Sequence, residues 1–381
     1  MTISLKKIII NTWKTLSAII IKFNEIIFAV NKFSDYWSGK FMARISIKDV
    51  AERAGVSIPT VSRVLNNSNH PVAEKTQKKV MKAIQELDYR PDISAQSLRQ
   101  SFNNIIALIT RDISDPYFGE MARGVTETAN KYGILSFVCN TGRNPENEIQ
   151  YHELLWQHRV RGIILGGGGL NLEAYKIKLQ EQINRYKANG HKIVSLAPQG
   201  FDMDYVMIDN RGTGELITDY LIARGHTSIA YISGPQNVYT ALDRLEGYKL
   251  CLKKHNLPSD DLMIAYSDNS WKGGYEAANI LLNRSIKFTG VCCGNDNVAV
   301  GALRAFKERG LAMPQDVSVI SIGDLPSASY IVPSLTTVRV PLYDMGAKAV
   351  DIIMSDDTQE YNANIIFKTM ISERQSVSNI K

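Results

Sequence analysis

The residues best suited to chemistry stand in one stretch, residues 46–66, which reads SIKDVAERAGVSIPTVSRVLN. Its second half holds side chains that a short helix would leave exposed: Ile58, Pro59, Thr60, Ser62, Arg63 and Asn66. Arginine, serine and asparagine hydrogen-bond to phosphates and base edges, whereas Ile58 and Pro59 offer apolar contact, for instance to a thymine methyl group. These residue types at this spacing favour recognition of a DNA duplex.

Two short helices would have to position these side chains. The first half of the stretch places apolar residues on one helix face, at Ile47, Val50, Ala51 and Ala54. Gly55 can adopt the positive φ that ends this helix, Ser57 is a good N-cap for the next, and Pro59 suits its first turn. The pattern predicts a helix-turn-helix whose second helix can enter a major groove, with an ordinary helical hairpin as the alternative.

Charge agrees with a head that binds phosphates. The 381 residues carry a net charge of +6, but residues 1–43 and residues 44–102 each carry +4 and the remainder about −2. A third helix over residues 74–87 would close the head through an inner face of Val80, Ala83, Ile84 and Leu87. A basic head on a slightly acidic body is typical of a phosphate-binding module joined to a core that does not bind DNA.

The residues 49–66 resemble the head of the lactose repressor/galactose repressor (LacI/GalR) family, and YRPDISAQSLR at 89–99 resembles its hinge segment. Further motifs match in the family's order: DISDPYFGEMARGV at 112–125, RGHTSIAYISGP at 224–235, RLEGYKL at 244–250, GNDNVAVGALRAFKERGLAMPQDVSVI at 294–320 and PSLTTVRVPLYDMGAKAV at 333–350. The resemblance covers residues 44 to 375. It implies a ligand-responsive regulator that binds an operator as a homodimer.

The resemblance also implies which residues of the head and hinge contact DNA: Ser46, Ile47, Ser57, Ile58, Pro59, Thr60, Ser62, Arg63, Asn66, Thr76, Tyr89, Ala95, Gln96 and Leu98. Residues 93–100 are too few for a stable isolated helix. In the family this segment becomes helical on the operator and pairs with its dimer mate, and Ala95 and Leu98 occupy the places used in the minor groove. An apolar wedge there kinks DNA by prying open a base step.

Residues 1–43 precede the part that resembles the family. Lys14 and Lys22 interrupt their apolar stretch, so no uncharged run approaches the ~18 residues of a membrane-spanning helix, and no small-residue cleavage site follows. Met42 stands four residues before the family's usual start. We therefore expect upstream sequence from an over-called start codon, or else an amphipathic extension, in either case poorly ordered or loosely attached.

From Asn104 onward, strands alternate with helices of ten to fifteen residues, which predicts an α/β fold with parallel sheets. The first set has strands at 105–110, 134–140, 161–167, 191–197 and 205–210 and helices at 118–133 and 147–160; the second starts with a helix at 212–226 and has strands at 229–234, 262–268, 290–296 and 317–324. Two such sets suggest two lobes with a ligand crevice at the strands' carboxyl ends. The resemblance implies a core like that of periplasmic sugar-binding proteins, crossed three times by the chain, so that a segment near 340–368 returns to the first lobe.

Candidate effector-binding residues stand at the expected strand ends: Asp112, Ser114, Asp115, Tyr117, Phe118, Arg244, Asn295 and Asp296. Polar groups that make paired hydrogen bonds, together with aromatic walls, suit a sugar. Arg244 and Asn295 match positions at which the family contacts its effector. The alternatives are a plain turn at Asp115-Pro116 and a surface ion pair at Arg244.

Three departures from the family pattern bear on the effector. Gly323 replaces an aspartate that often contacts the ligand, Ala197-Pro198 stands where a polar residue is common, and Gly166–Gly169 replaces a more varied loop. The lost polar groups argue against an ordinary free hexose and leave room for a larger, modified or phosphorylated sugar. The glycine run could offer backbone N–H groups to an anion, or be a flexible surface loop.

Other functions have little support. The chain contains none of the G-x-x-x-x-G-K-[ST], G-x-G-x-x-G, G-x-S-x-G or H-E-x-x-H motifs, which argues against an enzyme, and no cofactor or metal is expected. Cys139, Cys251, Cys292 and Cys293 have no metal-ligand spacing and predict buried free thiols in a reducing compartment. His152 and His158 are expected at the surface.

We therefore predict a cytoplasmic repressor of carbohydrate-utilisation genes, with a DNA operator, a sugar-like effector and a second copy of itself as partners. Its expected parts are an extension at 1–43, a three-helix head at 44–91, a hinge helix and linker at 92–103, and a two-lobed effector-binding and dimerisation core at 104–381. The alternatives are a catabolite-control-type regulator with a phosphorylated carrier protein as corepressor, and a sugar-binding protein without a regulatory role.

Overall fold

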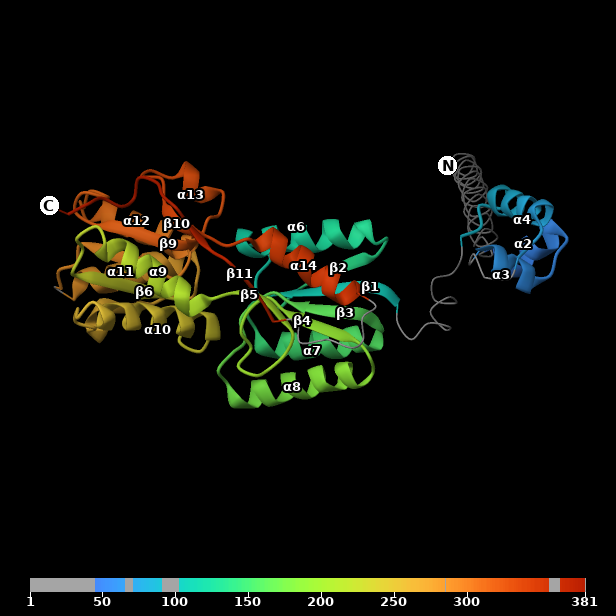
Figure 1. Cartoon of the computed structure of the whole chain (residues 1–381), viewed down its shortest axis with the longest axis horizontal. Helices are drawn as coiled ribbons and strands as arrows, with labels where there is room; N and C mark the ends of the chain where they lie inside the picture. The colour runs from blue at the N-terminus through green and yellow to red at the C-terminus, as the bar shows by residue number, and fades with distance from the viewer. Residues whose placement is uncertain (1–44, 66–70, 91–102, 285, 356–363, 381) are drawn as a thin grey trace, which may run out of the picture. The chain divides into compact units, whose positions relative to one another are not determined.

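The structure is a computed structural model that describes residues 45–65, 71–90, 103–284, 286–355 and 364–380. The chain divides into two compact units, Met1–Gln100 and Ser101–Lys381 (Figure 1). The predictions for residues 1–43, Asn66, Ala95, Gln96 and Leu98 lie outside the described residues. Among the helices of the described part, none is both long enough and apolar enough to cross a membrane.

The head consists of three helices, α2 Ile47–Ala54, α3 Ile58–Leu65 and α4 Glu74–Glu86. Ser46 and Asp49 form a capping box at the start of α2, and Gly55 ends that helix at a φ of 67°. The apolar faces meet in one buried cluster of Val50, Ala51, Ala54, Val61, Val80 and Ala83. The predicted helix-turn-helix and the third helix are confirmed.

The second unit contains two six-stranded sheets. The first has the order β11-β5-β4-β3-β1-β2, with β1 Asn103–Thr110, β2 Leu135–Asn140, β3 Val160–Leu165, β4 Lys192–Ser195, β5 Tyr205–Ile208 and β11 Asn364–Phe367. The second has the order β12-β10-β9-β8-β6-β7, with β6 Ile229–Ser233, β7 Ile264–Tyr266, β8 Gly290–Cys293, β9 Ser318–Gly323, β10 Thr336–Arg339 and β12 Met370–Ser372. Neighbouring strands are parallel as predicted, apart from the antiparallel pair β10 and β12.

Helices cover both sheets. Those of the first lobe are α6 Pro116–Lys131, α7 Pro145–Gln157, α8 Glu173–Ala188 and α14 Leu342–Met354. Figure 1 shows α6 and α14 on one face of the first sheet and α7 and α8 on the other. Those of the second lobe are α9 Asn210–Ile222, α10 Tyr239–Lys254, the 3-10 turn Asp261–Met263, α11 Trp271–Asn283, α12 Asp296–Glu308 and α13 Ser327–Tyr330.

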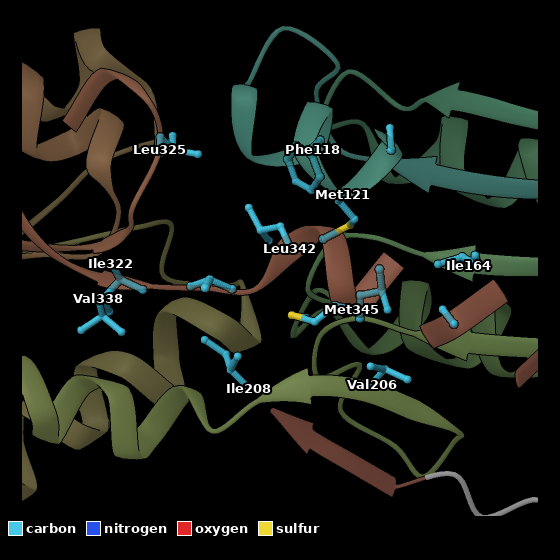
Figure 2. Packing of buried hydrophobic residues seen from close by; sticks show 14 of the residues in the cluster. Phe118, Met121, Ile164, Val206, Ile208, Ile322, Leu325, Val338, Leu342 and Met345 are labelled. Atoms are coloured by element: carbon cyan, nitrogen blue, oxygen red, sulfur yellow. The ribbon is translucent and has the colours of Figure 1, made fainter. Parts of the chain in front are cut away.

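The chain crosses between the lobes three times, as predicted. It leaves the first lobe after β5, returns after β10 to form α14 and β11, and enters the second lobe again at β12. One buried apolar cluster extends along these crossings (Figure 2). It joins Ile164 and Val206 of the first lobe, Leu342 and Met345 at the crossing, and Val338 of the second lobe.

Some local predictions were wrong. The helix expected at 147–160 ends at Gln157, because Arg159 takes a φ of 49° and Val160 begins β3. The strand expected at 290–296 ends at Cys293, because Asn295 caps α12. His152, expected at the surface, is fully buried on α7, and burial lowers its pKa to about 4.

The cysteines agree better with their prediction. All four are free thiols, and Cys251, Cys292 and Cys293 are buried, whereas Cys139 on β2 is only half-buried. Burial raises the pKa of the Cys251 thiol to about 11.

Candidate functional site

The second helix of the head presents the predicted DNA-contacting side chains on its open face. Three of them are exposed: Ile58, with 43% of its surface accessible, Pro59 and Arg63. Two others are half-buried, Thr60 and Ser62. Val61 points the other way and is completely buried in the head cluster. The hydroxyl oxygens of Ser57 and Thr60 lie 2.9 Å apart at the start of the helix. The helix thus offers a guanidinium, hydroxyls and a small apolar surface to a groove.

Other residues predicted to contact DNA also hold the head together. The Ser46 backbone N–H and hydroxyl both donate to Asp49 Oδ2, at 2.7 and 2.6 Å, and these bonds to Ser46 lower the pKa of Asp49. Ile47 and Tyr89 are half-buried against the head cluster, and Thr76 is half-buried on α4. The sequence did not predict one ion pair that joins two helices of the head: Arg53 Nη2 on α2 lies 2.6 Å from Glu86 Oε2 on α4.

The second unit has a cavity of about 380 Å³ at the carboxyl ends of the strands, lined by residues of both lobes. First-lobe strands lead into Arg111 after β1, Arg143 after β2, Gly166 after β3 and Ala197 after β4. Second-lobe strands lead into Gly234 after β6, Asp268 and Asn269 after β7, and Gly294 and Asn295 after β8. The position and volume suit a small-molecule ligand.

Arg244 on α10 is a buried arginine in the wall of this cavity. Its Nε donates to Asn210 Oδ1 at 3.0 Å, and its Nη1 donates to the Gly294 carbonyl at 2.7 Å. Both of these acceptors are neutral, so neither one neutralises the positive charge of the guanidinium, which lies in the wall of the cavity. A surface ion pair, the alternative reading of the sequence, is therefore wrong for Arg244.

The loop after β1 contributes Asp115, Tyr117 and Phe118 to the cavity. Asp115 caps α6 through the Tyr117 N–H at 3.1 Å, and burial raises the pKa of its carboxyl group. The two rings stand edge to face with centroids 5.5 Å apart, and burial raises the pKa of Tyr117. This is an aromatic wall beside polar groups.

Three predicted effector contacts do not line the cavity. Asp112 accepts from the Ser114 N–H and hydroxyl, so both residues close the loop on themselves. Asp296 is buried: Ser321 and Thr337 donate to its Oδ1 at 2.5 and 2.6 Å, and the Leu325 N–H donates to its Oδ2. It ties α12 to the second sheet. Gly323 adjoins it, since a Cβ there would lie 2.8 Å from Asp296 Oδ2.

Asn295 lines the cavity but already has partners. Its Oδ1 accepts from the Val298 N–H at 2.8 Å as the cap of α12, and its Nδ2 donates to the Asn269 carbonyl at 3.2 Å. One amide hydrogen remains for a ligand.

Sequence reasoning missed several lining residues, chiefly Arg111, Arg143, Asn237, Asp268 and Asn269. Arg111 and Arg143 stand at or near the carboxyl ends of predicted strands, so the strand-end rule could have found them. Arg111 is buried, with Nη1 2.6 Å from Glu148 Oε2, and the Tyr175 hydroxyl donates to the same oxygen at 2.7 Å.

The backbone N–H groups at the two ends of the glycine run are not free to bind an anion. The Gly166 N–H donates to the Ile109 carbonyl and the Gly169 N–H to the Pro198 carbonyl, both at 2.9 Å. Two of the four donors are therefore used by neighbouring backbone.

Comparison with known proteins decides the family. Residues 46–92 match the bacterial regulatory proteins of the lacI family, and residues 103–373 match the periplasmic binding proteins and sugar binding domain of the LacI family. The chain belongs to the LacI family. It is a DNA-binding transcriptional regulator. Helix α3 falls within the stretch that matches the regulatory proteins, and the residues that line the cavity fall within the stretch that matches the sugar binding domain.

Individual LacI-family members are similar along most of their length. The transcriptional regulator GalR of Escherichia coli strain K12 is 32% identical over 335 residues, 87% of this chain and 96% of that protein. The ribose operon repressor of the same strain is 34% identical over 314 residues, 82% and 93% of the two chains. The structure of the Lac repressor dimer bound to operator and the anti-inducer ONPF has a TM-score of 0.77 and 25% identity, and covers 88% and 99%.

Proposed function

We propose that the protein is a dimeric repressor of carbohydrate-utilisation genes that binds a pseudo-palindromic operator and responds to a sugar or sugar derivative in the cavity of its core. The observation that carries the proposal is that one chain contains both an exposed recognition helix and a cavity lined by two lobes. A ligand that binds the closed lobes better than the open ones shifts the core between two states. A role at DNA supports a cytoplasmic location for the protein.

The cavity favours a hydroxyl-rich ligand. Arg244 and Asn295 supply donors, Asp115 and Asp268 supply acceptors, and the rings beside Asp115 supply an apolar wall. The relative called the ribose operon repressor fits this chemical class. The proposed contacts exclude Asp112, Ser114 and Asp296, which do not line the cavity.

Exposed apolar residues support a homodimer. Leu135 on the edge strand β2 is 58% exposed, and Val332, after α13, is 90% exposed. Such side chains favour burial against a second copy, and the Lac repressor, to which the chain is similar, is a dimer in its operator-bound structure. Two copies would present two α3 helices to two half-sites.

Two experiments test the proposal. Selection of bound duplexes from random-sequence DNA by the full chain should yield a two-fold symmetric site; recovery of no preferred sequence would contradict a specific regulator. In a thermal-shift screen with sugars, sugar phosphates and purines, one sugar class should raise the melting temperature of the protein. At a hundredfold excess over Kd, binding adds about 2.7 kcal/mol to the free energy of unfolding. No shift by any of them would instead favour the catabolite-control-type regulator with a protein corepressor.

A further inference from the structure

The lobes are joined by backbone pairing beside the cavity as well as by the three crossings. The segment Gly169–Asn171, after β3 of the first lobe, meets Asn237–Tyr239, before α10 of the second lobe, in an antiparallel bridge between Leu170 and Val238. The Asn171 N–H donates to the Asn237 carbonyl at 2.7 Å, and the Tyr239 N–H donates to the Gly169 carbonyl at 3.1 Å. Because each bond joins one lobe to the other, separation of the lobes at this point breaks both.

Side chains strengthen the bridge. Leu170 is buried in an apolar cluster of the first lobe, and Val238 packs against that same cluster although it comes from the second lobe. The Tyr239 hydroxyl donates to Asn171 Oδ1 at 3.2 Å. The bridge therefore buries apolar surface as well as pairing backbone.

Glycine is needed on the first-lobe side. A Cβ at Gly168 would lie 2.9 Å from Thr240 Cγ2 of the second lobe, and a Cβ at Gly169 would lie 2.8 Å from the Cα of Gln199. Arg111 Nη2 holds the Gly168 carbonyl at 2.5 Å, and Gln199 Nε2 holds the Gly167 carbonyl at 2.8 Å. Side chains of the first lobe therefore hold the carbonyl groups of the glycine run, and Gly168 packs against Thr240 of the second lobe.

We propose that this bridge is a latch that forms only when the cleft is closed and that it couples effector occupancy to closure. Gly166, Gly167, Gly168, Leu170 and Val238 line the cavity as well, so a ligand there touches both sides of the latch. The inference rests on the proposed function and adds the regulation of that same site. It assigns the glycine run to lobe closure rather than to anion binding.

A pair of variants at Tyr239 tests the backbone bond. Tyr239 is the first residue of α10 and follows Val238 with a ψ of 122°, so proline fits there and removes the N–H. Tyr239→Ala removes the same side chain but keeps the N–H, which makes it the matched control. In hydrogen exchange of the full chain, the peptide holding Asn171 should exchange about fivefold faster in Tyr239→Pro than in Tyr239→Ala. Equal exchange would overturn the latch, whether or not any sugar binds.

A cysteine pair tests the coupling. Leu170 and Val238 form the non-hydrogen-bonded type of antiparallel pair, whose Cα atoms lie about 4.5 Å apart, within reach of a disulfide. Leu170→Cys/Val238→Cys should crosslink on mild oxidation, and the oxidised protein should bind the selected DNA with an affinity that the sugar found by thermal shift no longer alters. The single variants are the controls. Failure to crosslink, or an unchanged response to that sugar, would overturn the proposal.

Discussion

Arg63 shows what one exposed side chain on the recognition helix contributes. It lies on α3 opposite the buried Val61, where a duplex can reach it. Arg63→Ala should weaken binding of the selected operator by about tenfold to a hundredfold, the value of one good contact, in an electrophoretic mobility assay. Arg53→Ala, which only loosens the pair with Glu86, is the control. An equal loss of ligand binding in Arg63→Ala would contradict the assignment.

Arg244 makes the corresponding prediction in the core. Its fork holds Asn210 and Gly294 while it lines the cavity, and lysine cannot reproduce that planar geometry. Arg244→Lys should weaken effector binding about tenfold to a hundredfold in calorimetry and leave operator binding without effector in place. Arg211→Lys on neighbouring α9, an exposed partner of Glu246, should change neither property. Similar ligand affinities in the two variants would refute the role of Arg244.

His152 predicts a dependence of stability on pH. Burial lowers its pKa to about 4, below the 6.5 of an exposed histidine, so the unfolded chain binds the proton more tightly. The free energy of unfolding is therefore not reduced by His152 above pH 6.5, where the ring is neutral in both states. It falls by roughly 3 kcal/mol as the pH drops to 4, because only the unfolded chain readily takes up the proton. His152→Leu should flatten this part of the urea-unfolding profile, and His158→Gln, exposed at the end of the same helix, should not. A profile unchanged by His152→Leu would contradict the prediction.

Among the elements, α6 and α14 approach each other through glycines. A Cβ at Gly124 would lie 2.1 Å from the Tyr343 carbonyl oxygen, and a Cβ at Gly346 would lie 2.5 Å from the Met121 carbonyl oxygen. Gly124→Ala should therefore lower the free energy of unfolding by about 1–3 kcal/mol, as overpacking does.

Gly119 on the same helix is the control for that prediction. A Cβ there meets nothing within 4 Å, so Gly119→Ala should raise stability by up to about 1 kcal/mol through helix propensity. The contrast is measured by denaturant unfolding of both variants. Two stabilising substitutions would show that the two helices separate easily.

The elements also show how far a sequence leads. Periodicity and caps located the head helices and most strands, since Gly55, Ser46 and the apolar runs act locally. The helix expected at 147–160 ends at Gln157 instead, because Arg159, between α7 and β3, takes a positive φ that no strong sequence signal marks. In the cavity, Asn295 was predicted but the inward turn of Asp296 was not, because its partners Ser321 and Thr337 come from strands far along the chain.

For the whole molecule, dimerisation decides whether two heads can read one operator. The exposed apolar residues Leu135 and Val332 lie in different lobes, so a second copy that covers both would fix the paired cores along their length. Leu135→Asp/Val332→Asp buries two charges in that interface, which costs far more than the apolar contact gains. In analytical ultracentrifugation the double variant should be a monomer, and its affinity for the two-fold symmetric site should fall to that for a single half-site.

Ile177→Asp is the matched control, since Ile177 on α8 is apolar and 49% exposed but lies on a different element from Leu135 and from Val332. It should remain a dimer with unchanged operator affinity. If the double variant also remains a dimer, the interface lies elsewhere. If it is a monomer that still binds the symmetric site as tightly as the wild type, each head acts alone, and closure of the core cannot regulate DNA binding by moving one head relative to the other.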